Sequence, residues 1–281
     1  MFAVEWLEFV KAVIIGIVQG ITEWLPISST GHMILVDEFL KLDVSKEFLD
    51  MFLVVIQFGS ILAVLVLFFH KLNPFSPRKS AQEKRQTLGL WGKVIVGSIP
   101  AAVLGLLFND LLTEYLYNYQ TVALMLILYG ILFIVLENRN RKRRPRVNTL
   151  EQLDYKTAFA MGAFQVLAMI PGTSRSGSTI LGAMFIGTSR FVAAEFSFFL
   201  AIPVMFGASG LRIVKYGLET GFAISSTEWM VLLTGLVVAF VVSLAAIRFL
   251  MGFIKKHDFK PFGYYRIVLG ILVLLYFALV H

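Results

Sequence analysis

The chain has 281 residues, of which 58% are hydrophobic and 15% are charged, with a formal net charge of +7 and no cysteine. Its mean hydropathy is +0.79. Soluble domains carry about 25% charged residues, so this composition excludes an ordinary soluble fold and predicts an all-α polytopic membrane protein, without disulfides or thiolate metal sites.

Six apolar runs are long enough to cross a hydrocarbon core about 30 Å thick as helices. They cover residues 48–70, 91–111, 119–138, 190–214, 227–252 and 264–281. Two other apolar runs, between Lys11 and Glu23 and between Lys156 and Pro171, are too short to span, and each is followed by a polar segment. A short helix, a polar break and a second short helix predict a re-entrant hairpin. Such a break is tolerated at membrane depth only where protein or a water-filled cavity satisfies its backbone.

The two hairpins resemble each other. GIVQGITEWLPISSTGH (16–32) aligns with GAFQVLAMIPGTSRSG (162–177). We therefore interpret the single membrane domain, 1–281, as a duplication with repeat 1 at 1–140 and repeat 2 at 150–281, each with one hairpin and three transmembrane helices. Three spans are an odd number, so the copies insert in opposite orientations. This predicts an inverted-topology repeat, in which sites lie near the midplane where broken helices meet.

The positive charge is concentrated in three short segments between apolar runs, KLNPFSPRKSAQEKRQ, NRNRKRRPRVN and KKHDFK. Nucleic-acid binding would require a soluble fold or base-stacking elements, whereas basic loops beside spans follow the positive-inside rule. We expect these loops in the cytoplasm, both termini outside, and no nucleic-acid partner.

The first break begins with Gln19 and Glu23, which are four residues apart and share one helical face. Their oxygens suit a hard divalent cation such as Mg²⁺ or Ca²⁺. Pro26 ends the helix, and Ser28 or Ser29 can cap the next one.

The second break is PGTSRSGST, residues 171–179. An arginine at membrane depth costs at least about 2.5–3.5 kcal/mol, so Arg175 requires an explanation. Thr173 or Ser174 can cap the following helix, and two helix N-termini facing each other would bind an anion. Arg175 then serves either as a bidentate fork for phosphate or as a structural partner of Glu23.

The segments QGITE (19–23), LPISSTGH (25–32) and PGTSRSGST (171–179) resemble the signature motifs of the undecaprenyl-diphosphate phosphatase family, also called the bacitracin-resistance protein family. The resemblance covers nearly the whole chain. It implies hydrolysis of undecaprenyl diphosphate to undecaprenyl phosphate and inorganic phosphate, which recycles the lipid carrier of cell-wall synthesis and confers bacitracin resistance. It also implies a bacterial plasma-membrane enzyme, a site open to the outer face and dependence on a divalent cation.

The family's functional serine and histidine map onto Ser29 and His32. We expect Ser29 to attack the terminal phosphorus and His32 to manage the proton, although either of them can be the nucleophile. Catalysis would also need Glu23 and Arg175, and Gln19 would bind the cation together with Glu23. The residues expected to bind substrate phosphate are Ser28, Thr30, Ser174, Arg175, Ser176 and Thr179.

The alternative function is an inverted-repeat transporter or flippase of a lipid phosphate or small anion, because facing broken helices also build transporters. The expected partners are a polyprenyl diphosphate lipid and membrane lipids, with a homodimer as one option. Outside the two breaks, we expect Glu195 and Arg190 at the membrane interface and Gln165 in an interhelical hydrogen bond.

Overall fold

The computed structural model describes residues 2–280, without the side chains of residues 2–4, 37, 109, 110, 113 and 280. Every regular element in this range is a helix. The helices are α1 (Phe2–Thr22), α2 (Ser29–Phe39), α3 (Lys46–Leu67), α4 (Phe69–Leu72), α5 (Ala81–Leu116), α6 (Tyr119–Asn140), α7 (Tyr155–Val166), the 3₁₀ turn η1 (Leu167–Met169), α8 (Arg175–Phe185), α9 (Arg190–Thr220), α10 (Ser226–Phe253) and α11 (Lys260–Val280). Six of them, α3, α5, α6, α9, α10 and α11, are long and apolar enough to cross a membrane, which confirms the predicted spans.

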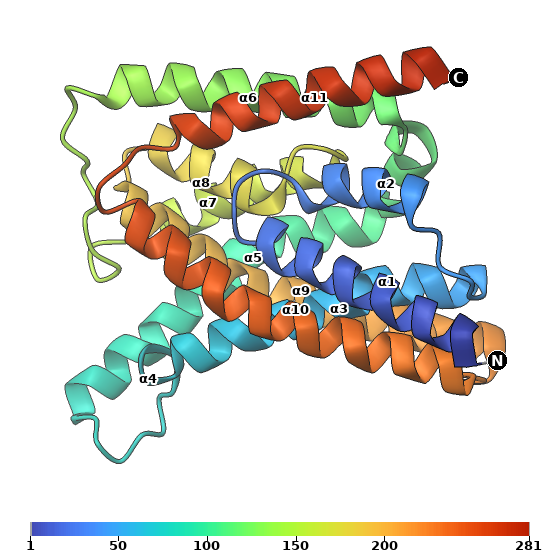
Figure 1. The fold of residues 1–281 in the computed structure, drawn as a ribbon. Coiled ribbons are helices and arrows are strands. Elements are labelled where there is room, and N and C mark those ends of the chain that lie inside the picture. Colours follow the sequence, from blue (N-terminus) through green and yellow to red (C-terminus); the bar gives the residue numbers. More distant parts are fainter. Residues whose placement is uncertain (1, 281) are drawn as a thin grey trace.

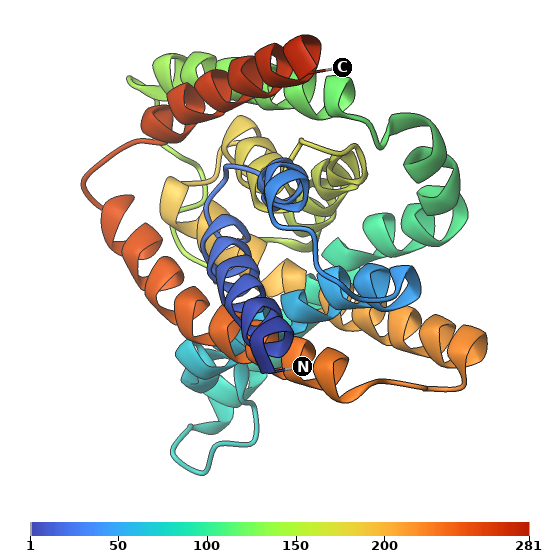
Figure 2. The same ribbon diagram turned by 45° about the vertical axis from the view of Figure 1, so that its right-hand side comes forward.

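The shorter helices lie inside a frame of long ones. α6 and α11 run side by side along one edge, and α1, α3, α9 and α10 form the opposite side (Figure 1). Figure 2 shows α2, α7 and α8 between these two groups. The second helix of the first hairpin and both helices of the second are therefore enclosed by longer helices, which provide the protein surroundings that a broken helix requires.

The helix pairs follow the predicted duplication. α1 packs on α10 and α7 packs on α5, so in each half the first hairpin helix contacts the second span of the other half. Gly16 approaches the backbone oxygen of Gly235, and Gly162 approaches that of Gly97 in the same way. A Cβ at Gly16 or Gly162 would collide with the facing carbonyl, so close packing requires glycine there. The inverted orientation of the two halves stays a prediction.

The first hairpin helix is longer than the sequence suggested. We expected a short helix after Lys11, but α1 has 21 residues. The charges in its first turns have partners: Lys11 Nζ donates to Glu8 Oε1 at 2.7 Å and to the carbonyl of Lys41 at 2.6 Å, while Glu8 Oε2 accepts from the N–H of Asp43 at 3.0 Å. Because the segment after α2 satisfies these groups, the helix extends beyond the apolar run.

The basic loops share one end of the molecule. The loops after α4, α6 and α10 lie at the left of Figure 1, whereas the α2–α3, α5–α6 and α9–α10 loops and both ends of the chain lie at the right. The charge is thus separated along the direction of the spans. Which end faces the cytoplasm stays a prediction.

Candidate active site

The two breaks have the same backbone conformation at the start of their second helix. Ser28 has φ 76° and Ser174 has φ 75°, a region that is costly for residues other than glycine. Each serine side chain accepts a hydrogen bond from a backbone N–H three residues ahead, that of Gly31 at 3.2 Å and that of Gly177 at 3.1 Å. Ser28 and Ser174 are therefore the N-caps of α2 and α8, which decides both capping alternatives.

The two breaks contact each other directly. The hydroxyl of Ser176 lies 3.2 Å from the carbonyl oxygen of Glu23 and 3.3 Å from that of Leu25. Arg175 Nε and one terminal nitrogen donate to Glu23 Oε1 at 3.2 and 3.1 Å. The duplication predicts this meeting of two segments about 150 residues apart in the sequence.

The carboxylate of Glu23 is the centre of this contact. It is buried, with 5% exposure. Its Oε2 accepts from Gln19 Nε2 at 3.0 Å and from the Ser29 hydroxyl at 3.4 Å, while Oε1 faces Arg175. The ion pair thus brings together four residues predicted from the sequence. Gln19, Glu23 and Ser29 come from the first half, and Arg175 comes from the second.

The guanidinium of Arg175 is fully engaged. Besides Glu23, it donates to the carbonyl of Ser197 on α9 at 2.9 Å, and it lies 5.5 Å from the centre of the Trp24 ring. Both members of the Arg175–Glu23 pair are largely shielded, with side-chain exposures of 12% and 5%. Removing one member of such a pair is strongly destabilising because it leaves a buried charge unpaired. Sequence reasoning missed Ser197, because its contact is made mainly by the backbone carbonyl.

His32 is held at both ring nitrogens. Nδ1 lies 2.7 Å from the carbonyl oxygen of Ser28, which can only accept, so Nδ1 carries the proton. Nε2 then accepts from the hydroxyl of Tyr265 at 2.6 Å, and the two rings stack with 5.6 Å between centroids. The structure gives His32 no hydrogen bond to Ser29, whose hydroxyl points to Glu23 instead. Tyr265 is a further residue that sequence reasoning missed.

The six side chains expected to bind phosphate fall into two groups. Thr30, Ser174 and Arg175 keep partial exposure, whereas Ser28, Ser176 and Thr179 are fully buried. The Thr179 hydroxyl donates to the carbonyl of Arg175 at 2.8 Å, one turn back in α8. The buried hydroxyls therefore fix the shape of the two breaks, and the partly exposed group is the one accessible to a ligand.

Arg266 on α11 connects both breaks, and sequence reasoning missed it. It is fully buried, and the structure shows no carboxylate paired with it among the described side chains. Its nitrogens donate to five backbone carbonyls, those of Pro26 (3.1 Å), Gly172 (2.9 Å), Thr173 (3.0 Å), Met125 (3.3 Å) and Leu126 (3.4 Å). The signal was present, because an arginine inside the predicted span 264–281 carries the same cost that identified Arg175.

The described residues contain no cluster of three or more His, Asp or Glu side chains that suits a metal. They do bring two hard oxygen donors together, the Glu23 carboxylate and the Ser29 hydroxyl, while Gln19 turns its amide nitrogen toward Glu23 Oε2. Mg²⁺ commonly binds one or two protein carboxylates and completes its shell with substrate phosphates and water. The single carboxylate therefore fits the expected Mg²⁺ or Ca²⁺ only together with phosphate oxygens from the substrate.

One expectation outside the breaks is wrong, and one stays a prediction. Glu195 has an exposure of 2%, and its Oε1 accepts from Lys71 Nζ at 2.6 Å, so a side chain 124 positions away shields it; its place at the membrane interface stays a prediction. Gln165 is likewise buried, but its side-chain amide has no hydrogen-bond partner among the described residues.

Comparison with known proteins identifies the family of the chain. The family model described as "Bacitracin resistance protein BacA" matches residues 12–272. The chain belongs to this family. Among BacA family relatives, it is 61% identical over 273 residues to "Undecaprenyl-diphosphatase 1" of Clostridioides difficile, covering 97% of each chain. It is 60% identical over 274 residues to "Undecaprenyl-diphosphatase" of Acetivibrio thermocellus, covering 98% of this chain and 99% of the relative. It is 59% identical over 276 residues to the protein of that name from Enterococcus faecalis, covering 98% of each.

Proposed function

We propose that this chain is an integral membrane phosphatase that hydrolyses undecaprenyl diphosphate to undecaprenyl phosphate and inorganic phosphate. This activity recycles the lipid carrier of cell-wall synthesis and confers bacitracin resistance. The observation that carries the proposal is the convergence of Ser29, Glu23 and Arg175 from both halves on one buried contact. The curated relatives at about 60% identity carry the name of this activity.

Arg175 binds the terminal phosphate in this proposal. Its Nε and one terminal nitrogen both donate to Glu23 Oε1 in the structure, and a terminal phosphate offers this fork two acceptor oxygens with more charge. The N-termini of α2 and α8 add backbone N–H groups and positive dipole ends at the same place. Arg175 thus exchanges a carboxylate for a phosphate, and its charge stays compensated throughout.

Ser29 attacks the terminal phosphorus, and the bond from that phosphorus to the bridging oxygen breaks. Undecaprenyl phosphate leaves and a phosphoserine remains. The Ser29 proton passes to Glu23, because Glu23 Oε2 is the acceptor that the hydroxyl already faces.

His32 acts in the second step. Its Nε2 is the basic nitrogen, since Nδ1–H is committed to the carbonyl of Ser28. Tyr265 orients the ring through its hydroxyl, which donates to Nε2 and gives way to the attacking water in this step. Nε2 takes a proton from that water, the bond from the Ser29 oxygen to phosphorus breaks, Glu23 returns its proton to Ser29, and inorganic phosphate leaves.

Gln19 and Glu23 would hold the divalent cation, which supplies neutralisation of diphosphate charge when bound. We expect Glu23→Gln to abolish nearly all turnover, and Gln19→Glu to retain turnover with a shifted cation optimum. A Glu23→Gln protein with near-wild-type, chelator-sensitive turnover would remove Glu23 as the cation ligand.

The deciding experiment measures phosphate release by purified protein given farnesyl or undecaprenyl diphosphate, with and without a chelator. We expect release from both substrates and its loss with the chelator. Movement of a labelled lipid phosphate across vesicles without phosphate release would instead support the flippase.

We also propose that the site opens to the outer face of the bacterial plasma membrane, with the basic loops inside and both termini outside. The native chain has no cysteine, so a single introduced cysteine is the only thiol that can react. Asn148→Cys, in an exposed basic loop, should react with an impermeant thiol reagent only after the membrane is opened. Ala223→Cys, exposed at the opposite end, should react in intact protoplasts. The reverse pattern would overturn the orientation.

A further inference from the structure

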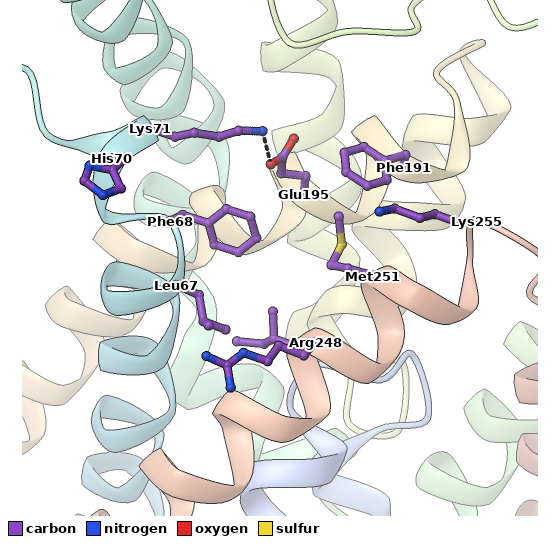
Figure 3. A pocket seen from close by; sticks show the side chains of 10 residues that line it. Leu67, Phe68, His70, Lys71, Phe191, Glu195, Arg248, Met251 and Lys255 are labelled. Atoms are coloured by element: carbon purple, nitrogen blue, oxygen red, sulfur yellow. Dashed lines mark hydrogen bonds and ion pairs between the residues drawn. The ribbon is translucent and has the colours of Figure 1, made fainter. Parts of the chain in front are cut away.

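A cavity lined by apolar and charged side chains lies at the basic end of the molecule, outside the candidate active site. It has a volume of about 350 Å³ and is open to the surface between the ends of α3, α9 and α10. Figure 3 shows its side chains, with Lys71 and Glu195 on one side, Arg248 across the groove from them, and Lys255 beside Phe191. We call it the basic groove.

The charges of the basic groove do not cancel. Lys71 is paired with Glu195. Arg248 and Lys255 have no ion pair or hydrogen bond from their side chains to any side chain that the structure describes. Lys255 Nζ lies 5.9 Å from the centre of the Phe191 ring, which favours a cation but does not neutralise it. The groove therefore has an excess of positive charge, and its natural ligand is an anion.

The position of Arg248 points to a ligand at headgroup depth. It lies five residues before Phe253, where the spanning helix α10 ends, which places it about 7.5 Å inside that end. Basic loops at a membrane surface need no lipid to explain them, but a cation within the span needs water or phosphate oxygens at that depth.

Apolar side chains continue outward from the groove. Its own lining includes Leu67 and Met251. Just outside, Val66, Phe69 and Phe249 are exposed by 57%, 55% and 56%. A small soluble anion would use only the cations, whereas an amphiphile would also cover these surfaces.

We propose that the basic groove binds the phosphate headgroup of an anionic membrane phospholipid. Arg248 and Lys255 contact the phosphate, and the acyl chains lie along Val66, Phe69 and Phe249.

Native mass spectrometry of the full-length protein in a neutral detergent tests this proposal. Dioleoyl phosphatidylglycerol is the probe, dioleoyl phosphatidylcholine is the zwitterionic control, and glycerol 3-phosphate represents the free headgroup. The double variant Arg248→Gln/Lys255→Gln should bind phosphatidylglycerol about 30-fold more weakly, since each cation near a membrane surface contributes about 1 kcal/mol, or about fivefold.

The matched control is Arg143→Gln/Arg144→Gln, which removes two exposed cations from the α6–α7 loop and changes the net charge equally. It should bind phosphatidylglycerol within threefold of the wild type. Neither pair touches the candidate active site, so unchanged phosphate release in both variants verifies folding. If both variants lose the same affinity for phosphatidylglycerol, general surface charge explains the binding and the proposed site is overturned. Binding of glycerol 3-phosphate as tight as that of phosphatidylglycerol, or no preference for phosphatidylglycerol over phosphatidylcholine, would overturn the lipid as its ligand.

Discussion

The two breaks of the membrane domain start from one backbone design and carry different chemistry. Ser28 and Ser174 cap their helices with the same φ angle, and the next residue is Ser29 in the first break and Arg175 in the second. The same position therefore presents a hydroxyl in one half and a guanidinium in the other, and both reach Glu23. If the two halves arose by duplication, as the sequence predicts, the breaks have kept the same backbone shape and have diverged in the side chains that meet between the halves.

Gln19 and Gln165, a second pair of equivalent positions, differ in their hydrogen bonding. Gln19 donates to Glu23 one turn ahead, whereas its counterpart Gln165 has Met169 at that distance and no hydrogen-bond partner among the described residues. The first half therefore pairs its amide with a carboxylate, while the second half buries an amide without a hydrogen-bond partner among the described residues.

The largest effect is expected at Ser29. Loss of a nucleophile costs on the order of 10⁴–10⁶-fold in kcat. Ser29→Ala should therefore lose at least about 10⁴-fold, measured as phosphate release by protein with an unchanged Tm. The second-break control is Ser178→Ala, whose hydroxyl faces only the carbonyl of Arg175 in its own helix and should stay within tenfold of wild type. Activity above 1% in Ser29→Ala would move the nucleophile to His32.

Arg175 comes next. A lysine keeps the charge but cannot make two parallel hydrogen bonds to phosphate. A preorganised donor to developing charge contributes about 2.7–4 kcal/mol, so Arg175→Lys should lose on the order of 10²–10³-fold in kcat/KM. Arg175→Ala should lose more. Thermal stability and phosphate release should be measured on the same purified samples.

The double variant Glu23→Gln/Arg175→Gln separates the two interpretations of this ion pair. If Arg175 serves only to neutralise Glu23, the double variant should recover the stability that each single variant lacks. Normal turnover in a stable Arg175→Lys protein would remove the bidentate phosphate contact from the mechanism.

A smaller effect is expected at Tyr265, which has no equivalent contact in the second half. A neutral hydrogen bond contributes about 0.5–1.5 kcal/mol. Tyr265→Phe should therefore lower kcat by about 2–10-fold and leave KM unchanged, because the hydroxyl orients His32 and does not contact substrate. Tyr264→Phe, one residue earlier and exposed, is the matched control. A change in KM alone would place Tyr265 at the substrate instead.

The smallest effect, and the only gain, is expected at Gln165. Removing a buried polar group that lacks a partner relieves a penalty of about 1–3 kcal/mol. Gln165→Leu should raise Tm in detergent with unchanged phosphate release, whereas Gln19→Leu should lose activity. A lower Tm for Gln165→Leu would show that the amide has a function in the second half.

Most of the fold could be predicted from the sequence, because spans depend on the length and polarity of each run. The two breaks could also be predicted, because proline, glycine and hydroxyl residues interrupt two apolar runs at equivalent positions. The length of α1 could not be predicted, because the charges of Lys11 and Glu8 are satisfied by contacts with the chain after α2.

The side chains that converge in the candidate site could be predicted from the sequence. The groups that hold them in place could not. Glu23 and Arg175 follow local patterns, but the carbonyl of Ser197 is a backbone contact that no residue type reveals. The burial of Glu195 depends on Lys71, 124 positions away, which no local pattern indicates. Arg266 was detectable by the same membrane-cost argument as Arg175 and was passed over because its run was long enough to count as an ordinary span.

The position of Arg266 also constrains how the enzyme is made. The ribosome delivers this arginine to the membrane only after both hairpins have been synthesised. Until α11 inserts, the carbonyls of Pro26, Gly172 and Thr173 lack their shared donor, so nascent chains contain both breaks of the candidate active site without the side chain that connects them. We expect such chains to be inactive and open to membrane proteases, which makes completion of synthesis a condition for activity.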